Sequence, residues 1–322
     1  SKEEIEVVIE KEEEGTRFII PPEALNLEYI VKYLKDAGEE VKTDDELEKL
    51  IKRKVSIVIK KADEKDRHNY IQAAEDQENG KAAFSAVSGI CDIYVLLMES
   101  TSNEDWLYIE KFNRKLTIEL PLDEEIVKAF SQRKVNKEKL GVYRYNPETN
   151  QWDYAGGKVN LNTGKIAFNT NHLSKYAVFE YNKTFKDIQN NWAREYIEVL
   201  ASKHIVHGIN ADSYQPDRSV SRAEFTKMLL EALNLVNSEA ETSFIDVGKD
   251  AWYYKYVAAA QKLDITAGTS MNRFKPEEVI TRQDMSVIAY KAVKAAEIDL
   301  AEVVEYKEFA DESQISSYAK EA

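Results

Sequence analysis

The chain of 322 residues contains one cysteine and no hydrophobic run long enough to cross a bilayer. A single cysteine excludes a disulfide within the chain. Cys91 lies in the apolar stretch 89–97, which indicates a buried structural thiol. The longest apolar stretch, residues 85–98, is interrupted by Asp92 and is too short for a transmembrane helix. We therefore expect no membrane insertion.

Basic residues are also fewer than acidic ones. Lysine and arginine number 44 against 58 acidic residues, which gives a formal net charge of −14 at pH 7. Binding to nucleic acid requires a basic surface, so the charge argues against that class of partner. The short basic cluster Lys52-Arg53-Lys54 flanks a strand-like run and indicates a solvated sheet edge.

Residue patterns of the common catalytic and metal sites are missing as well. The sequence has no cysteine cluster, no HExxH zinc motif, no phosphate-binding glycine loop and no nucleophile elbow. His204 and His207 lie near the expected end of a helix and are interpreted as groups that compensate the helix dipole, not as metal ligands. We expect no enzyme, no cofactor and no metal.

The most informative feature present is a motif that occurs twice, about 60 residues apart, and begins a third time. The first copy contains Phe185-Lys186-Asp187, Trp192-Ala193, His207-Gly208, Tyr214-Gln215-Pro216 and Ser221-Arg222-Ala223-Glu224-Phe225. The second contains Phe244-Ile245-Asp246, Trp252-Tyr253, Ala267-Gly268, Phe274-Lys275-Pro276 and Thr281-Arg282-Gln283-Asp284-Met285. The third opens at Phe309-Ala310-Asp311. Such a period indicates supersecondary units that pack on one another.

Each copy shows apolar residues at helical spacing on both sides of a loop with glycine and proline, which predicts helix, loop, helix. Before the repeats, alternating residues predict strands at 5–9, 55–59, 115–120, 140–145, 165–169 and 176–181. Helices are predicted at 27–37 and 45–52. We expect a multidomain chain: a mainly β, sandwich-like module with inserted helices (α+β) at 1–181, repeats at 183–237 and 242–298, and the start of a third at 305–322.

These residues resemble the S-layer homology (SLH) domain, whose pattern is F-x-D, W-A, G, F-x-P and T-R-A-E-F. The resemblance implies all-α helix-loop-helix repeats that form a pronged bundle. It also implies grooves between the prongs that bind secondary cell-wall polysaccharide, commonly with pyruvylated sugars. The segment 140–181 is similar to β-rich modules that precede such repeats.

Arg222 and Arg282 are the first candidate binding residues. Ser221 and Thr281 are each followed three residues later by an acid, which is a capping-box pattern. Each arginine therefore falls in a first helical turn, where the helix dipole disfavours a cation. A guanidinium beside free backbone N–H groups suits the carboxylate of a pyruvyl ketal. The alternative is that both arginines pair with neighbouring acids and brace the loop.

Further candidates occupy equivalent positions in both copies. Trp192 and Trp252 begin the first helices and either pack in the core or stack on sugar rings. Asp187 and Asp246 precede those helices as turn or cap residues. Gly208 and Gly268 are expected at turns that require positive φ or close backbone approach.

A different chemistry is suggested by His172-Leu173-Ser174, just before the last predicted strand. This tripeptide resembles the self-cleaving site of GAIN and ZU5 domains, where a hydroxyl attacks the preceding peptide bond with histidine as base. The alternative is that His172 ends a turn and Ser174 bonds locally. Autoproteolysis at Leu173/Ser174 is the enzymatic alternative function.

No secretory leader is visible at Ser1. The chain is thus either cytoplasmic or a mature or partial form of an exported protein, and a sequence that stops within a third repeat favours the latter. The resemblance implies a surface protein held non-covalently to the Gram-positive wall, with the cell-wall polysaccharide as partner. Assembly of a surface lattice with other S-layer subunits is the main alternative. We predict that Arg222→Ala weakens wall binding and that adding Arg282→Ala weakens it further.

Overall fold

The computed structural model describes residues 7–11, 17–19, 32, 54–78, 80, 82–98, 106–109, 111–132, 134–299, 310 and 312–322. Its internal contacts divide the chain into two compact units. The first, here called the β unit, comprises residues 1–204 and 210–213. The second, the repeat unit, comprises residues 205–209 and 214–322. Each unit is described by itself.

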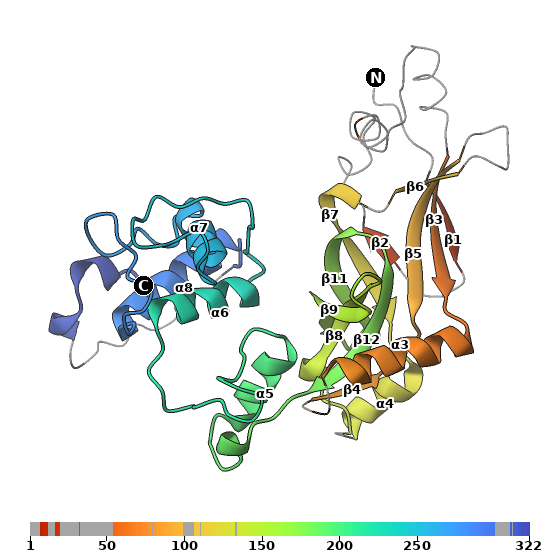
Figure 1. The fold of residues 1–322 in the computed structure, drawn as a ribbon, viewed down its shortest axis with the longest axis horizontal. Coiled ribbons are helices and arrows are strands. Elements are labelled where there is room, and N and C mark those ends of the chain that lie inside the picture. The colour runs from red at the N-terminus through yellow and green to blue at the C-terminus, as the bar shows by residue number, and fades with distance from the viewer. Residues whose placement is uncertain are drawn as a thin grey trace. The chain divides into compact units, whose positions relative to one another are not determined.

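Two sheets form the β unit, which confirms its β-rich character (Figure 1). Within the described residues, the larger sheet has the strand order β1-β3-β5-β12-β8-β9, with β4 paired to β12 and β6 to β5. Its strands are β1 (Val7–Lys11), β3 (Lys54–Lys61), β4 (Ala83–Ala86), β5 (Cys91–Met98), β6 (Trp106–Ile109), β8 (Leu140–Asn146), β9 (Gln151–Gly156) and β12 (Lys175–Asn182). The smaller sheet has the order β10-β11-β7-β2, built from β2 (Arg17–Ile19), β7 (Lys111–Pro121), β10 (Lys158–Asn160) and β11 (Lys165–His172).

The side-chain alternation of β12 explains how the sheets are layered. Tyr176 and Val178 point into a core that the larger sheet shares with Ile118 and Ile166 of the smaller sheet. Ala177 and Phe179 point the other way, into a second core. Successive residues of a strand face opposite sides, so β12 is buried on both faces. Cys91 belongs to the shared core, and the predicted buried thiol is confirmed.

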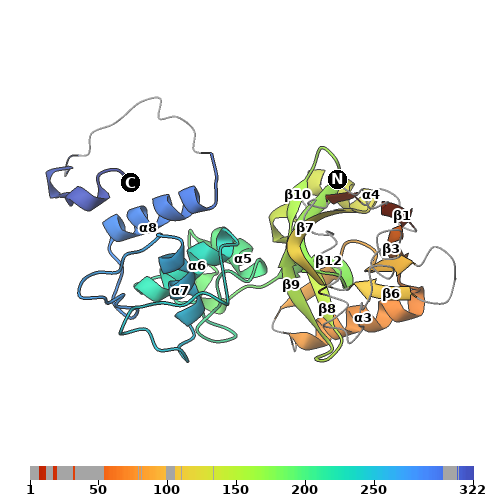
Figure 2. The same ribbon diagram turned by 90° about the horizontal axis from the view of Figure 1, so that it is seen from above.

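Two helices complete the β unit. Helix α3 (Glu64–Gln77) begins at Asp63, whose side chain accepts a hydrogen bond from the Asp66 N–H at 2.8 Å. Its Ala74 packs in the second core, against the face of the sheet that Phe179 lines. Helix α4 (Glu124–Ser131) packs against the shared core instead. The two helices thus lie on opposite sides of the strands (Figure 2).

Most predicted strands of this region are confirmed. Those at 55–59, 115–120, 140–145, 165–169 and 176–181 lie within β3, β7, β8, β11 and β12. Of the strand predicted at 5–9, residues 7–9 are confirmed in β1 (Val7–Lys11), and residues 5 and 6 lie outside the described residues. The helices predicted at 27–37 and 45–52 lie outside the described residues, apart from residue 32. Helices α3 and α4 were not predicted.

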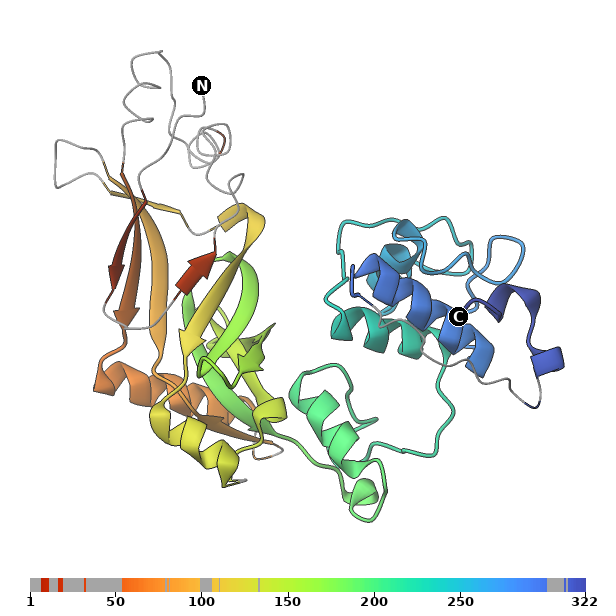
Figure 3. The ribbon, with the colours of Figure 1, turned by 180° about the vertical axis from the view of Figure 1, so that it is seen from behind.

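The repeat unit contains the second helix of the first copy and both helices of the second (Figure 3). These are α6 (Arg222–Ala232), α7 (Tyr254–Lys262) and α8 (Arg282–Ala295), followed by the 3-10 turns η4 (Glu312–Gln314) and η5 (Ser317–Ala319). Leu230 of α6, Ala259 of α7 and Ile288 of α8 meet in one core. The alanine run of residues 258–260 is fully buried, so the backbone of α7 approaches its neighbours closely.

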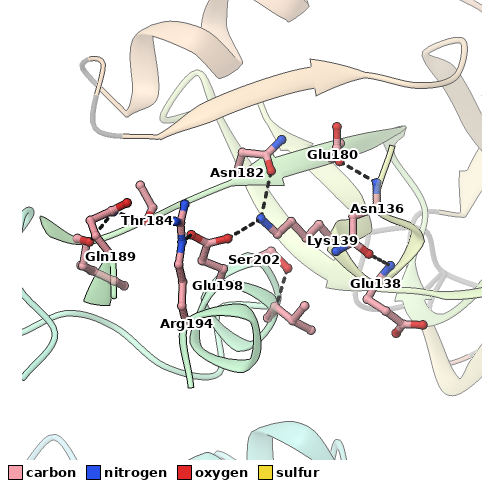
Figure 4. A network of polar contacts seen from close by, with 12 residues as sticks. Asn136, Glu138, Lys139, Glu180, Asn182, Thr184, Gln189, Arg194, Glu198 and Ser202 are labelled. Carbon is pink, nitrogen blue, oxygen red and sulfur yellow. Dashed lines mark hydrogen bonds and ion pairs between the residues drawn. The ribbon is translucent and has the colours of Figure 1, made fainter. Parts of the chain in front are cut away.

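The first helix of the first copy, α5 (Arg194–Ser202), belongs by its contacts to the β unit. Figure 4 shows Lys139 of the 3-10 turn η2 (Lys137–Lys139) lying between Asn182 and Glu198. Its ammonium donates to Glu198 at 3.0 Å and to Asn182 at 3.3 Å. Arg194 donates to the same Glu198 at 2.9 Å. At the end of the helix, the hydroxyl of Tyr143 lies 3.0 Å from Nε2 of His204. Charge pairing and aromatic packing therefore attach α5 to the sheet.

We expect Glu198→Gln to loosen this attachment. The side chains of Glu198 and Lys139 are only 12% and 13% exposed, so losing the carboxylate leaves a poorly solvated ammonium, which costs about 2–3 kcal/mol. Burial opposes ionisation of Glu198, but the hydrogen bonds from Arg194 and Lys139 outweigh it and lower its pKa. The stabilisation is thus present above the ordinary glutamate pKa of about 4.3 and is lost as pH falls through the lowered value.

Amide exchange of residues 194–202, corrected for intrinsic rates, measures this effect between about pH 6 and about pH 3. Glu195→Gln is the matched control, because Glu195 is an exposed acid on the same helix. Equal protection of α5 in both variants at neutral pH would contradict the prediction.

Candidate functional site

The second helix of each repeat begins at a side-chain cap. Ser221 accepts from the Glu224 N–H at 3.2 Å, and Glu224 accepts from the Ser221 N–H at 2.9 Å, a complete capping box. Thr281 accepts from the Asp284 N–H at 3.2 Å. The shorter Asp284 bonds elsewhere. Both predicted helix starts are confirmed. Each places an acidic residue, Glu224 or Asp284, in the first turn of its helix.

A cavity of about 310 Å³, here called groove 1, lies beside the start of α6. It is lined by residues 205–209 and 214–216, Arg218, Val220, Glu224, Lys227, Met228 and Trp252. Lys227 donates to the carbonyl of Ile205 at 3.1 Å, and burial lowers its pKa. Arg218 donates to Glu224. Burial opposes ionisation of Glu224, but bonds from Arg218 and Ser221 outweigh it and lower its pKa. Groove 1 thus combines charged side chains that are hydrogen-bonded in place with an apolar wall.

A second cavity of about 490 Å³, groove 2, lies beside the start of α8. It is lined by residues 265–269, Arg222, Asp284, Val287, Ile288, Lys291 and Tyr318. Arg222 donates to Asp284 at 3.1 Å and to the carbonyl of Phe274 at 2.9 Å. The hydroxyl of Tyr318 donates to the other oxygen of Asp284 at 2.8 Å. One acid therefore joins an arginine from the first copy to an aromatic residue from the third.

The two grooves are built from equivalent parts. Each contains the glycine loop after a first helix, residues 205–209 or 265–269. Each contains the acid three residues after a cap, Glu224 or Asp284. Each is closed by an aromatic residue of the following copy, Trp252 or Tyr318. Groove 1 is thus built from two consecutive repeats and groove 2 from residues of all three copies, which fits units that are incomplete alone.

Comparison with known proteins agrees with this repeated construction. The model of the family described as the S-layer homology domain matches residues 184–226 and 243–286, one match for each full copy. The chain carries S-layer homology domains. Each match ends just inside the second helix, so it includes the cap and the arginine that follows it.

Relatives of this SLH chain are enzymes and surface proteins. It is 41% identical over 223 residues to an amylopullulanase of Thermoanaerobacterium thermosulfurigenes, which covers 69% of this chain and 12% of the relative. It is 36% identical to the exoglucanase XynX of Acetivibrio thermocellus over 58% of this chain and 16% of that protein. It is 32% identical to the surface-layer 125 kDa protein of Lysinibacillus sphaericus over 41% of this chain and 11% of the relative. The chain thus spans under a fifth of each of these proteins.

These findings make the chain an SLH-domain surface protein, located outside the cell and associated with the cell wall. The SLH domains anchor such proteins to the wall. The 223-residue match is longer than the stretch from Thr184 to the last residue, so it also includes part of the β unit.

The two predicted binding arginines lie in different environments. Arg222 is 4% exposed, and its guanidinium also lies over the ring of Phe274, 5.1 Å from the centroid. Arg282 is exposed and lines neither groove. The first N–H groups of α6 are already used, since Arg222 donates to the carbonyl of Glu278 and Ala223 to that of Pro276. The predicted anion site of free N–H groups is therefore absent at α6.

The aromatic candidates also differ. Trp252 is 52% exposed and closes groove 1, whereas Trp192 is 86% exposed and lines neither groove. Tyr318 is 55% exposed and takes the equivalent place in groove 2. Tyr318 was not predicted from the sequence, because the first two copies have tryptophan at this place. The signal was present, since Tyr318-Ala319 follows Phe309-Ala310-Asp311 as Trp192-Ala193 follows Phe185-Lys186-Asp187.

Asp187 and Asp246 brace loops. Asp246 accepts from the N–H groups of Phe274 and Lys275, both at 2.9 Å. Burial works against its ionisation, yet these two donors lower the pKa of Asp246. Asp187 accepts from the hydroxyl of Ser213 at 2.7 Å. In the described contacts, both aspartates thus act as structural hydrogen-bond acceptors within loops.

The two glycines are not equivalent. Gly268 adopts φ +79°, and a Cβ there would lie 2.5 Å from the carbonyl oxygen of Arg273. Only glycine fits that position without strain. Gly208 lines groove 1 without the left-handed conformation. Next to it, His207 lies beyond Ser202, the last residue of α5, and burial lowers the pKa of this histidine.

His172 and Ser174 stand at the turn between β11 and β12, as predicted. The hydroxyl of Ser174 donates to the carbonyl of Tyr145 at 3.2 Å. The backbone of His172 exchanges hydrogen bonds with the hydroxyl of Thr170. Hydrogen bonds thus hold both residues, although Ser174 bonds to Tyr145 of β8 and not locally. Self-cleavage stays a prediction. In the described part of the chain, no helix meets the length and hydropathy of a membrane span, and no acidic, histidine or cysteine side chains gather as a metal site.

Proposed function

We propose that the chain is a binding module, not an enzyme, and that it attaches its parent protein to the wall by gripping secondary cell-wall polysaccharide. The observation that carries this proposal is the repeated construction of grooves 1 and 2. Each offers an exposed aromatic ring, which suits the C–H face of a sugar, next to cationic side chains, which suit an acidic substituent.

The cations favour a polymer that bears carboxylates, such as a pyruvylated polysaccharide. Groove 1 presents Arg218 and Lys227, and groove 2 presents Lys291 together with the almost fully buried Arg222. A chain with a net charge of −14 is repelled by an acidic polymer as a whole. Local cations in the grooves offset that repulsion. We further propose that the repeats form the pronged arrangement of the family, with one groove between consecutive repeats.

The test is co-sedimentation of the chain with purified Gram-positive walls, before and after mild-acid removal of the secondary polysaccharide. We expect binding to disappear with the polysaccharide. We also expect Lys291→Ala to weaken binding severalfold, about 1 kcal/mol, because it removes one charge-assisted contact from groove 2. Lys262→Ala, at an exposed lysine of α7 outside both grooves, should bind as the wild type.

Two outcomes would contradict the proposal. Binding that persists on stripped walls would place the ligand in peptidoglycan or in a protein, as lattice assembly with other surface subunits requires. Equal binding by the two lysine variants would remove groove 2 from the contact surface.

A further inference from the structure

The β unit contains a larger cavity than either groove. It measures about 810 Å³ and lies where β5, β8, β11 and β12 begin or end. Pockets for small ligands fall in the range of about 300–1,000 Å³. The cavity is placed on sheet strands and on helix α3, which contributes Tyr70. Sites built on such elements hold their side chains more firmly than sites on loops.

The lining of this cavity is positively charged in an acidic chain. Its cations are Lys60, Lys111, Arg144 and Lys175, and its acids are Asp92 and Glu148. The strand register explains how three of these charges come together. Lys60 of β3 pairs with Asp92 of β5, which pairs in turn with Lys175 of β12. Directly opposed residues point to the same face of a sheet, so two lysines flank a single carboxylate.

Fixed contacts orient part of this lining. Lys175 donates to Asp92 at 2.8 Å, and Arg144 donates to Asp153 of β9 at 3.1 Å. Burial disfavours the charged form of Lys175, but the bond and charge of Asp92 outweigh it and raise its pKa. The ammonium therefore stays charged at neutral pH. Asp92 already accepts a hydrogen bond from Lys175. The exposed ammonium of Lys60 has three donors and can bind an anion.

Tyrosine rings form the rest of the wall. Tyr70 and Tyr145 lie edge to face, with ring centroids 4.7 Å apart, and Tyr94 lines the same cavity. The hydroxyl of Tyr145 donates to Asn150 at 2.6 Å, which fixes its ring. Tyrosine offers an apolar face to sugar C–H groups and a hydroxyl to sugar oxygens. Cations and tyrosines together match an acidic saccharide.

We propose that this cavity is a second saccharide-binding site, independent of grooves 1 and 2, for a sugar that carries a carboxylate or a phosphate. Lys60 and Lys111 bind the anionic group, and the tyrosines contact the sugar ring. The residues His172 and Ser174 also line the cavity, so the tripeptide that resembled a cleavage site contributes to its wall. The β unit then adds a contact to the wall instead of acting only as a spacer.

Isothermal titration of the full chain tests this proposal with three probes: a galacturonic acid trisaccharide, glycerol 3-phosphate and neutral maltotriose. We expect at least one anionic probe to bind, with maltotriose at least about tenfold weaker. Lys60→Glu/Lys111→Glu should weaken the anionic probe by about tenfold or more, because it replaces two charge-assisted contacts by repulsion. Lys60→Ala/Lys111→Ala is the control for folding. If it has a native near-UV spectrum and also binds the anionic probe more weakly, the loss in the charge-reversed variant is not caused by a folding defect.

Lys134→Glu/Lys158→Glu carries the same change of charge at exposed lysines outside the cavity and should bind as the wild type. Binding of the trisaccharide alone identifies a carboxylate ligand, and binding of glycerol 3-phosphate alone identifies a phosphate ligand. Three results would overturn the proposal: no binding of either anion, equal binding of maltotriose, or a loss caused by Trp252→Ala but not by the Lys60 and Lys111 variants. The last would place the sugar in groove 1.

Discussion

Replacing Arg222 with alanine is expected to destabilise the repeat unit by about 3 kcal/mol. The guanidinium is almost fully buried and donates to both Asp284 and the Phe274 carbonyl. Its removal leaves the partly buried Asp284 carboxylate without its cationic partner and the buried Phe274 carbonyl without this donor, and it removes the cation–π contact with the Phe274 ring. Because Arg222 belongs to the first copy and Asp284 to the second, the damage should spread across both.

Amide exchange of the peptides that cover α6 and residues 274–288 measures this effect in the full chain. Arg282→Ala is the matched control, since Arg282 is the equivalent residue of the second copy but is exposed. Its effect on stability should stay below about 0.5 kcal/mol. If the two variants were equally stable, the interpretation of Arg222 as a buried link between repeats would be wrong.

This contrast changes how loss of wall binding by an arginine variant is interpreted. Weaker binding by Arg222→Ala reports both the ligand contact and the altered shape of groove 2. Arg222→Lys separates the two effects in part, because lysine keeps the charge but cannot donate to Asp284 and Phe274 with the same planar geometry.

Sequence alone predicted the local features of the repeats. The caps at Ser221 and Thr281 depend only on residues three positions apart, and both are present. Asp284 stands where the first copy has the longer Glu224, and the structure shows the Asp284 carboxylate bonded to Arg222 and Tyr318 instead of the cap.

Long-range features were not predictable in this way. The pair of Arg222 and Asp284 joins residues 62 positions apart, and it exists because consecutive copies pack together. Helix α3 was missed because its sequence is strongly polar, and tertiary packing of residues such as Ala74 holds it in place. The attachment of α5 to the β unit depends on Lys139, which no repeat pattern includes.

The largest effect on wall binding is expected from removing the aromatic residue of both grooves. Trp252→Ala and Tyr318→Ala should each lower the affinity for walls about tenfold, as loss of one buried aromatic contact does. Together they should lower it about hundredfold, because two independent tenfold losses multiply. Both side chains are more than half exposed, so their loss costs the fold little.

Binding isotherms on purified walls measure this series, and two controls accompany it. Trp192→Ala removes a tryptophan that is 86% exposed and lines neither groove, and it should bind nearly as the wild type. Tyr318→Phe keeps the ring but loses the bond to Asp284, so it should retain most of the binding. A Trp192→Ala defect as large as that of Trp252→Ala would show that the grooves are not the contact surface.

The salt dependence separates the aromatic contribution from the charged one. Contacts between exposed charges weaken as ionic strength rises, whereas ring stacking does not. Added salt also screens the repulsion between an acidic chain and an acidic polymer. The hundredfold loss in the double variant should therefore persist at high salt, while the loss in Lys291→Ala should shrink. If both losses shrank in parallel, the rings would act only by positioning the neighbouring charges, as Tyr318 positions Asp284.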